Sequence, residues 1–227
     1  MKACTVAHAV IVVALWGCAT SGGPAGGTAA PADVTFRAGY YDEDNHPVSG
    51  SSLPQTVSLL IRVIAGDFAG TPNNEVILQL SIPIGSEAKL AIGDQLRKID
   101  ALAAPLTRDA INSGIVVTPP ETRFARFATL VLYPNAPKGV GWSSFRGSEP
   151  NELLVLAYFD RPCTVSGTAR RYGYATTFNV VVPSAGVHFL RMSRDGGRDS
   201  HATWSATPEQ VVLAISDTGR PFWPAPK

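Results

Sequence analysis

Short hydrophobic runs, separated by clusters of Gly, Pro, Asn and Asp, recur along the chain after residue 32. They read VTFRAGYY, TVSLLIRVIAG, EVILQLSIPIG, GIVVTP, RFATLVLYP, ELLVLAYFD, TTFNVVVP, GVHFLRMS and QVVLAISD. Runs rich in Val, Ile, Leu, Thr and aromatic residues, with turn residues between them, are typical of β-strands. Because only one helical segment accompanies them, the pattern predicts an all-β protein, an antiparallel β-sandwich.

The strands differ in how polar their two faces are. The run ELLVLAYF, residues 152–159, is apolar throughout, so we expect a central strand that is covered on both faces. The run VTFRAGY, residues 34–40, alternates, so we expect one of its faces to be exposed. Residues 33–227 are interpreted as a single sandwich domain of the transthyretin or immunoglobulin type.

The helical segment is a short insertion between strands. Leu96, Ile99 and Leu102 recur at three-residue spacing, which predicts a helix over residues 95–103. Asp94 is placed to cap it, and Pro105 ends the helical pattern. Another turn is expected at residues 107–112, and the insertion is expected to cover one end of a sheet.

The amino-terminal segment, residues 1–17, has the pattern of a secretory signal. Lys2 precedes an apolar stretch from Thr5 to Trp16. A stretch of about a dozen residues is too short to cross a bilayer, which takes about 20 residues. A charged start followed by a short apolar middle and small residues is typical of a signal peptide, which is removed from the mature protein.

The four residues Leu15-Trp16-Gly17-Cys18 resemble the lipobox of bacterial lipoproteins. The resemblance implies that the signal is cut before Cys18, that the Cys18 thiol is diacylated, and that the new amino terminus receives a third chain. Residues 18–32 would then be the lipidated cysteine and a Gly/Ala/Pro tether, which spans roughly 20 Å as a flexible coil. Since Ala19 follows the cysteine rather than Asp, the family analogy implies the outer membrane, facing the periplasm. An ordinary signal cut elsewhere is the alternative.

The charge of the chain bears on whether it binds nucleic acid, and its cysteine content bears on whether it forms disulfides. The chain has 19 basic and 18 acidic side chains, and removal of Lys2 leaves the two signs equal, which does not favour nucleic acid. Cys4 leaves with the signal and Cys18 is blocked by lipid, so Cys163 has no partner for a disulfide. We expect Cys163 to be a half-buried, inert thiol, because a reactive cysteine needs a nearby histidine and the nearest in sequence is His188.

The sequence shows no recognisable motif for catalysis, for metal binding or for a cofactor. Ser143 and Ser144 lie between glycines but miss the G-x-S-x-G spacing, and we expect a turn between strands there. The histidines after the signal, His46, His188 and His201, lack the spacing of zinc ligands. His188 alternates with apolar neighbours and is interpreted as an outward-facing strand residue. The sequence therefore favours a non-catalytic protein without cofactor.

The densest polar cluster, residues 42–46, reads DEDNH and follows a tyrosine pair. Its oxygen atoms could wrap a calcium ion, but the calcium-loop template fails because Val48 stands where glycine is needed. A solvated loop is the favoured interpretation, and residues 41–55 are too many for a tight hairpin turn. We expect this loop to bind a partner protein, with its contacts drawn from Tyr41, Asp42, Asp44, Asn45 and His46.

A second candidate contact patch lies in the run ARRYGYATTF. It combines cations and aromatic rings, which are common in protein interfaces: Arg170, Arg171, Tyr172 and Tyr174. An ordinary hairpin surface is the alternative. Three tryptophans, Trp142, Trp204 and Trp223, are either core residues or a ligand platform, and Trp204 lies in a turn-rich stretch.

The order of elements also resembles one lipoprotein family. A lipobox, a spacer, a strand, a polar loop with Asn45-His46-Pro47, and the apolar runs PQTVSLLIRVIAGDF and ELLVLAYFDRP are similar to TssJ, the outer-membrane lipoprotein of type VI secretion systems. That family is a lipid-anchored β-sandwich that docks an inner-membrane partner through loops, so the resemblance implies such a partner. The broader hypothesis is a non-catalytic envelope module that binds another protein. An enzyme or carbohydrate-binding sandwich is the remaining alternative.

Overall fold

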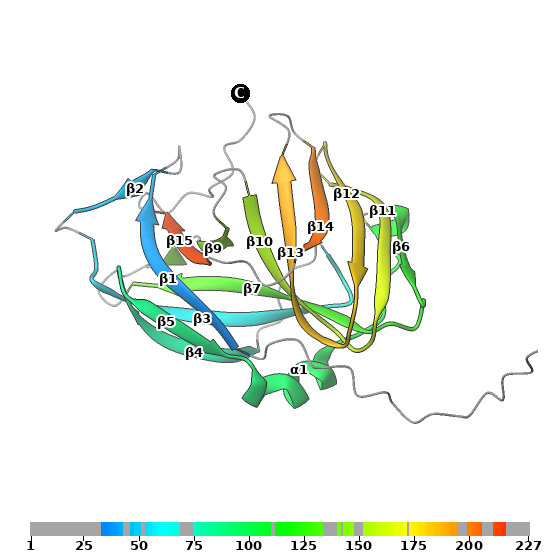
Figure 1. Ribbon diagram of the computed structural model, residues 1–227, viewed down its shortest axis with the longest axis horizontal. Coiled ribbons are helices and arrows are strands. Elements are labelled where there is room, and N and C mark those ends of the chain that lie inside the picture. Colours follow the sequence, from blue (N-terminus) through cyan, green and yellow to red (C-terminus); the bar gives the residue numbers. More distant parts are fainter. Residues whose placement is uncertain are drawn as a thin grey trace, which may run out of the picture.

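β-Strands make up most of the residues that the structure describes, and one short α-helix accompanies them (Figure 1). The computed structural model describes residues 33–42, 46–50, 53–68, 75–109, 112–133, 140–141, 143–147, 152–171, 173–194, 199–205 and 211–216. Within these ranges no helix has the length and apolar character needed to cross a membrane. The predicted all-β class with one short helical insertion is confirmed.

The strand bounds follow the predicted runs closely and add strands between them. In chain order the strands are β1 (Asp33–Tyr41), β2 (Pro47–Val48), β3 (Thr56–Ala65), β4 (Val76–Pro83), β5 (Glu87–Ala91), β6 (Ile115–Thr118), β7 (Phe124–Leu132), β8 (Val140–Gly141), β9 (Ser143–Arg146), β10 (Glu152–Phe159), β11 (Cys163–Arg171), β12 (Tyr174–Val182), β13 (Gly186–Arg194), β14 (Ser200–Ser205) and β15 (Val212–Ser216). The expected turn at Ser143 and Ser144 is wrong, because these residues lie in β9 and pair with β15. Trp204 lies in β14 rather than in a turn.

The strands form one branched sheet. Its main path runs β2-β1-β15-β9-β10-β13-β14-β12-β11-β6, and β10 also pairs with β7, which continues to β3 and β4. β5 pairs with β1, and β8 with β7. Most pairs are antiparallel, as predicted, but β1–β15 and β12–β14 are parallel. These parallel partners are not consecutive in the chain, so no hairpin fixes their direction.

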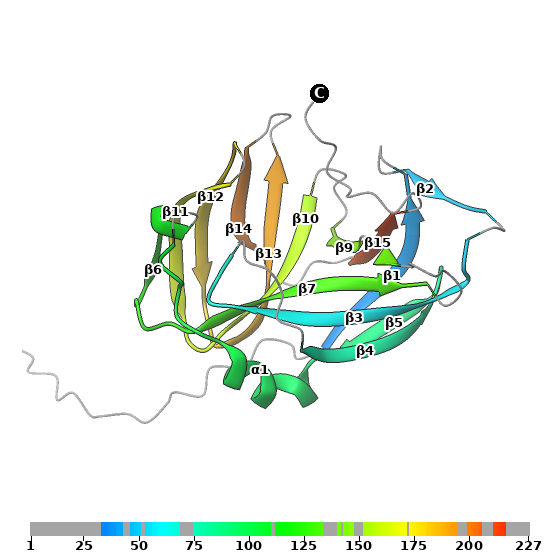
Figure 2. The same ribbon diagram turned by 180° about the vertical axis from the view of Figure 1, so that it is seen from behind.

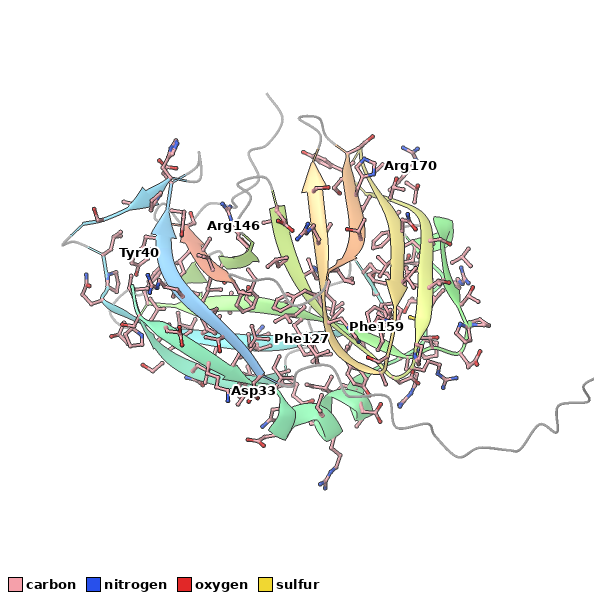
Figure 3. The ribbon with its side chains drawn as sticks, viewed as in Figure 1. Asp33, Tyr40, Phe127, Arg146, Phe159 and Arg170 are labelled. Atoms are coloured by element: carbon pink, nitrogen blue, oxygen red, sulfur yellow. The ribbon has the colours of Figure 1, made fainter. Side chains whose placement is uncertain are left out.

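The branch at β10 produces two layers and a curved extension (Figures 1 and 2). β1, β15 and β9 lie over β7, β3 and β4, and these layers enclose the first hydrophobic core, which includes Phe36, Leu59 and Leu213. The strands β13, β14, β12, β11 and β6 curl away from it and enclose a second core, which includes Phe124, Phe159 and Phe178. Figure 3 labels Phe127 in the first core and Phe159 in the second.

Strand β10 is the shared wall of the two cores. Leu154, Leu156 and Tyr158 belong to the first core, whereas Ala157 and Phe159 belong to the second. Successive side chains of a strand point to opposite faces, which explains why this run carries no polar alternation. The prediction of a central strand covered on both faces is confirmed. The prediction of a half-exposed β1 is also confirmed, because exposed and buried positions alternate along it.

The short helix α1 (Leu96–Leu102) closes the lower end of the first core. Ile99 is fully buried, and Leu96 and Leu102 pack against the same core, as their spacing predicts. Asp94 does not cap the helix. It lies in a 3-10 turn, η1 (Gly93–Gln95), which directly precedes α1. A second 3-10 turn, η2 (Asn112–Gly114), begins where the predicted turn at residues 107–112 ends.

Candidate functional site

The two predicted contact segments lie at the same end of the molecule, at the top of Figures 1 and 3. One is the turn between β1 and β2, with Tyr41, Asp42 and His46, and the other is the turn between β11 and β12, with Arg170 and Tyr174. They lie on opposite sides of this end, so the structure does not join them into one patch. Outside the described parts are Cys18, Asp44, Asn45, Tyr172, Trp142, Trp223 and the side chains of Arg171 and Trp204.

The first segment is a hairpin rather than a long open loop. β2 returns along β1, with Tyr41 opposite Pro47 and Tyr40 opposite Val48, so the predicted single loop over residues 41–55 contains a short pair of strands. The Asp42 amide donates to the His46 carbonyl at 3.1 Å, and the His46 amide donates to the Asp42 carboxylate at 2.8 Å. The described residues contain no group of three or more His, Cys, Asp or Glu side chains placed to hold a metal ion.

Tyr41 covers a buried cation. The Arg146 guanidinium lies 5.9 Å from the centre of the Tyr41 ring, and Arg146 is 6% exposed. Burial lowers the pKa of Arg146, and the interaction with Tyr41 opposes this shift. A tyrosine ring over a desolvated cation is a stabilising contact, so Tyr41 is part of the scaffold as well as of the surface.

The second segment borders an apolar cavity of about 150 Å³. Six lining residues come from β10 to β14, and they are apolar: Val155, Ala169, Phe178, Leu190, Met192 and Ala202. Tyr174 and Thr176 of β12, Arg126 of β7 and Phe68 complete the wall. Sequence reasoning found Tyr174 but missed the cavity, because its wall is assembled from segments distant in the chain.

Strand register places part of the cavity lining near the β11–β12 turn and part toward the middle of the strands. Tyr174 is the first residue of β12, and Thr176 lies opposite Ala169 of β11. Further along the strands, Ala202 of β14 lies opposite both Phe178 and Met192. Interiors of proteins are normally close-packed, and the small alanine side chains among larger ones leave this space unfilled.

Phe68 forms the wall that faces the curved sheet. Its ring stacks on Phe124, with centroids 4.4 Å apart, and it lies tilted against Phe178 at 4.7 Å. Its neighbour Asp67 accepts a hydrogen bond of 3.0 Å from the side-chain amide of buried Asn112. Phe68 is therefore fixed by contacts on two sides, although it follows the end of β3.

The described lining of the cavity is mainly apolar. Among the described lining residues none is acidic, and none is a histidine or cysteine. Its polar lining residues are Arg126, Tyr174 and Thr176, and the Thr176 hydroxyl lies 2.9 Å from that of Ser200. An apolar space with a few polar groups is the usual form of a small-molecule site.

Two predicted surface or half-buried residues are buried. His188 is 6% exposed, so its outward-facing assignment is wrong: its Nε2 lies 2.8 Å from the Ser184 carbonyl, and its ring faces Phe159. Burial lowers the pKa of His188, which keeps the ring neutral. Cys163 is also buried, and burial, with a smaller contribution from the charge of Asp160, raises the pKa of its thiol to about 12. A thiol with this pKa is a poor nucleophile.

A polar network that sequence reasoning missed joins α1 to the sheet. Tyr158 donates to the Asp100 carboxylate at 2.8 Å, and Arg123 donates to it at 2.6 Å. Arg123 also pairs with Asp160, which pairs with Arg161. The Tyr158 hydrogen bond, and then Arg123, hold the pKa of Asp100 below its usual value. Arg161 also pairs with Glu121 at 3.0 Å, so each charged group of the network has an oppositely charged partner, and we interpret the network as structural.

Strand β1 places the start of the described chain far from both turns. Asp33 lies beside α1, at the bottom of Figure 3, and its carboxylate pairs with Lys89 at 2.6 Å. The strand then runs for nine residues to Tyr41 at the opposite end. A strand of this length spans roughly 30 Å, because each residue adds about 3.3 Å.

Comparison with protein-family models, with curated proteins and with solved structures gave no match.

Proposed function

We propose that the chain is a lipid-anchored protein of the cell envelope that binds another envelope protein through its loop end, without catalysing a reaction. Residues 1–17 are the signal, Cys18 carries the acyl chains, and the segment that follows is the tether. The observation that supports this function most directly is the course of β1: it begins at Asp33, at the opposite end from the β1–β2 and β11–β12 turns.

This arrangement displays the turns away from the membrane. A tether of roughly 20 Å and a strand of roughly 30 Å together allow the turns to reach on the order of 50 Å from the anchor. Binding residues are commonly carried on loops that a rigid scaffold positions. We place the protein in the outer membrane facing the periplasm, where such a reach favours contact with a partner held elsewhere in the envelope.

Replacement of Cys18 by Ser is expected to move the protein from the membrane fraction to the soluble fraction, or to leave the signal uncleaved. Ser cannot form the thioether that carries the diacylglycerol, and stable anchoring takes at least two chains. Fractionation of cells and the mass of the amino-terminal peptide measure both outcomes. Cys4→Ser, within the same signal, is the matched control and should be processed normally. Unchanged processing and membrane retention in Cys18→Ser would remove the anchor from the proposal.

Replacement of Asp44 and His46 together by Ala is expected to reduce capture of the partner by at least about tenfold, because a few central residues carry most interface energy. Tyr41 and Asp42 are left in place, since they cover Arg146 and close the hairpin. The yield of the cross-linked complex in intact cells is the measurement. Lys98→Ala, on α1 at the far end, is the control. Loss of capture in Arg170→Ala alone would place the interface at the β11–β12 turn instead.

A further inference from the structure

We propose that the cavity beside the β11–β12 turn is a binding site for a compact aromatic molecule that carries one hydrogen-bonding group, the chemical class of phenols and indoles. This site is separate from the β1–β2 turn and from the lipid anchor, and it shares Tyr174 with the β11–β12 turn. Three properties of the cavity support the proposal: its size, the chemistry of its wall, and the position of its polar groups.

The size of the cavity sets the size of the ligand. Its volume is about 150 Å³. Apolar cavities of about this volume accept a benzene ring, whereas drug-sized ligands need sites of several hundred cubic ångströms. The two alanines, Ala169 and Ala202, keep this space open between β11 and β14. One ring with a small substituent fits, but an extended acyl chain or a sugar does not.

The wall favours an aromatic ring over an aliphatic one. The rings of Phe68 and Phe178 lie 4.7 Å apart and are tilted, so a third ring can meet an edge or a face. The thioether of Met192 contacts aromatic rings favourably, and the Arg126 guanidinium can lie over a π-face. An aliphatic ring of the same size gains only the apolar part of these contacts.

Two of the polar lining residues lie near the β11–β12 turn. Tyr174 and Thr176 are the first and third residues of β12, whereas Phe178 and Leu190 lie toward the middle of their strands. A hydroxyl donates one hydrogen bond and can accept others, so the Thr176 hydroxyl can bond a ligand while it remains paired with Ser200. The ligand is therefore oriented with its hydroxyl or ring N–H toward Thr176 and its ring toward Phe178 and Leu190.

Calorimetric titration with phenol and with cyclohexanol tests the proposal on the protein as isolated from cells. The expected result is one phenol site, with a dissociation constant on the order of 0.1–1 mM, because so small a ligand has few atoms with which to bind. Cyclohexanol is expected to bind at least about threefold more weakly, since it lacks the π-face.

Ala202→Leu fills the cavity and is expected to weaken phenol binding by at least about tenfold. Thr203→Leu adds a leucine at the next, exposed position of β14, whose side chain points to the other face, and should bind phenol as the native protein does. Ala202→Val fills less space and replaces Ala202→Leu if circular dichroism shows that the larger side chain prevents folding. Absence of phenol binding in the native protein, equal binding in the filled variant, or equal affinity for cyclohexanol would overturn the proposal.

Discussion

Replacement of Phe124 by Ala is expected to lower the free energy of unfolding by about 3–5 kcal/mol, the range for removal of a buried phenylalanine ring. Phe124 is fully buried and stacks on Phe68 at 4.4 Å and on Phe159 at 5.9 Å. Its backbone donates to the Ala104 carbonyl at 3.0 Å, which holds the segment after α1 against β7. Loss of the ring leaves a cavity among the other rings that rigid strands cannot close.

Urea unfolding measures this loss, with Phe124→Leu as the matched control that keeps most of the buried volume and should lose less than half as much. Because β10 contributes to both cores, we expect both to unfold together, with the same midpoint in far-UV and near-UV circular dichroism. A loss below about 1 kcal/mol in Phe124→Ala would contradict the assigned packing. Two separated transitions would contradict the shared wall.

The all-β class and the roles of β1 and β10 could be predicted because local alternation reports directly on which faces are covered. Strand β11 cannot be predicted from its own sequence, CTVSGTARR, because this sequence is polar and contains a glycine. Its identity as a strand depends on β12 and β6, which pair with its two edges. The parallel pairing of β1 with β15 also cannot be predicted from local sequence, because the two strands lie at opposite ends of the described chain.

The candidate sites show the same limit. The hydrogen bonds between Asp42 and His46 are local, but the polar pattern of this segment does not indicate that β2 pairs with β1. The cavity depends on Phe68, Arg126 and Met192, which belong to different elements and carry no common sequence signal. His188 was misassigned because alternation along β13 separates two faces but does not reveal that a core lies on each of them.

The turn at Gly66 is the feature that brings Phe68 to the cavity. Gly66 has a φ of +59°, a conformation that residues other than glycine adopt at a cost of roughly 1–2 kcal/mol. Its amide donates to the Phe124 carbonyl at 3.0 Å, and its carbonyl accepts from the Thr107 amide at 2.6 Å. A Cβ atom at this position would lie 2.3 Å from the Pro105 carbonyl oxygen. The backbone at Pro105 therefore leaves no room for a side chain at residue 66.

Gly66→Ala is therefore expected to lower the free energy of unfolding by about 3 kcal/mol or more, the sum of the conformational cost and the displacement of a hydrogen-bonded backbone. Gly85→Ala is the matched control, because Gly85 has a similar φ of +82° but nothing within 4 Å of the added Cβ. The control should lose only about 1 kcal/mol, so the difference between the two variants in urea unfolding isolates the steric contact. Because the turn also aims Phe68, Gly66→Ala should weaken phenol binding while Gly85→Ala leaves it unchanged. Equal losses of stability in the two variants would show that the close approach of Gly66 to Pro105 does not hold in solution.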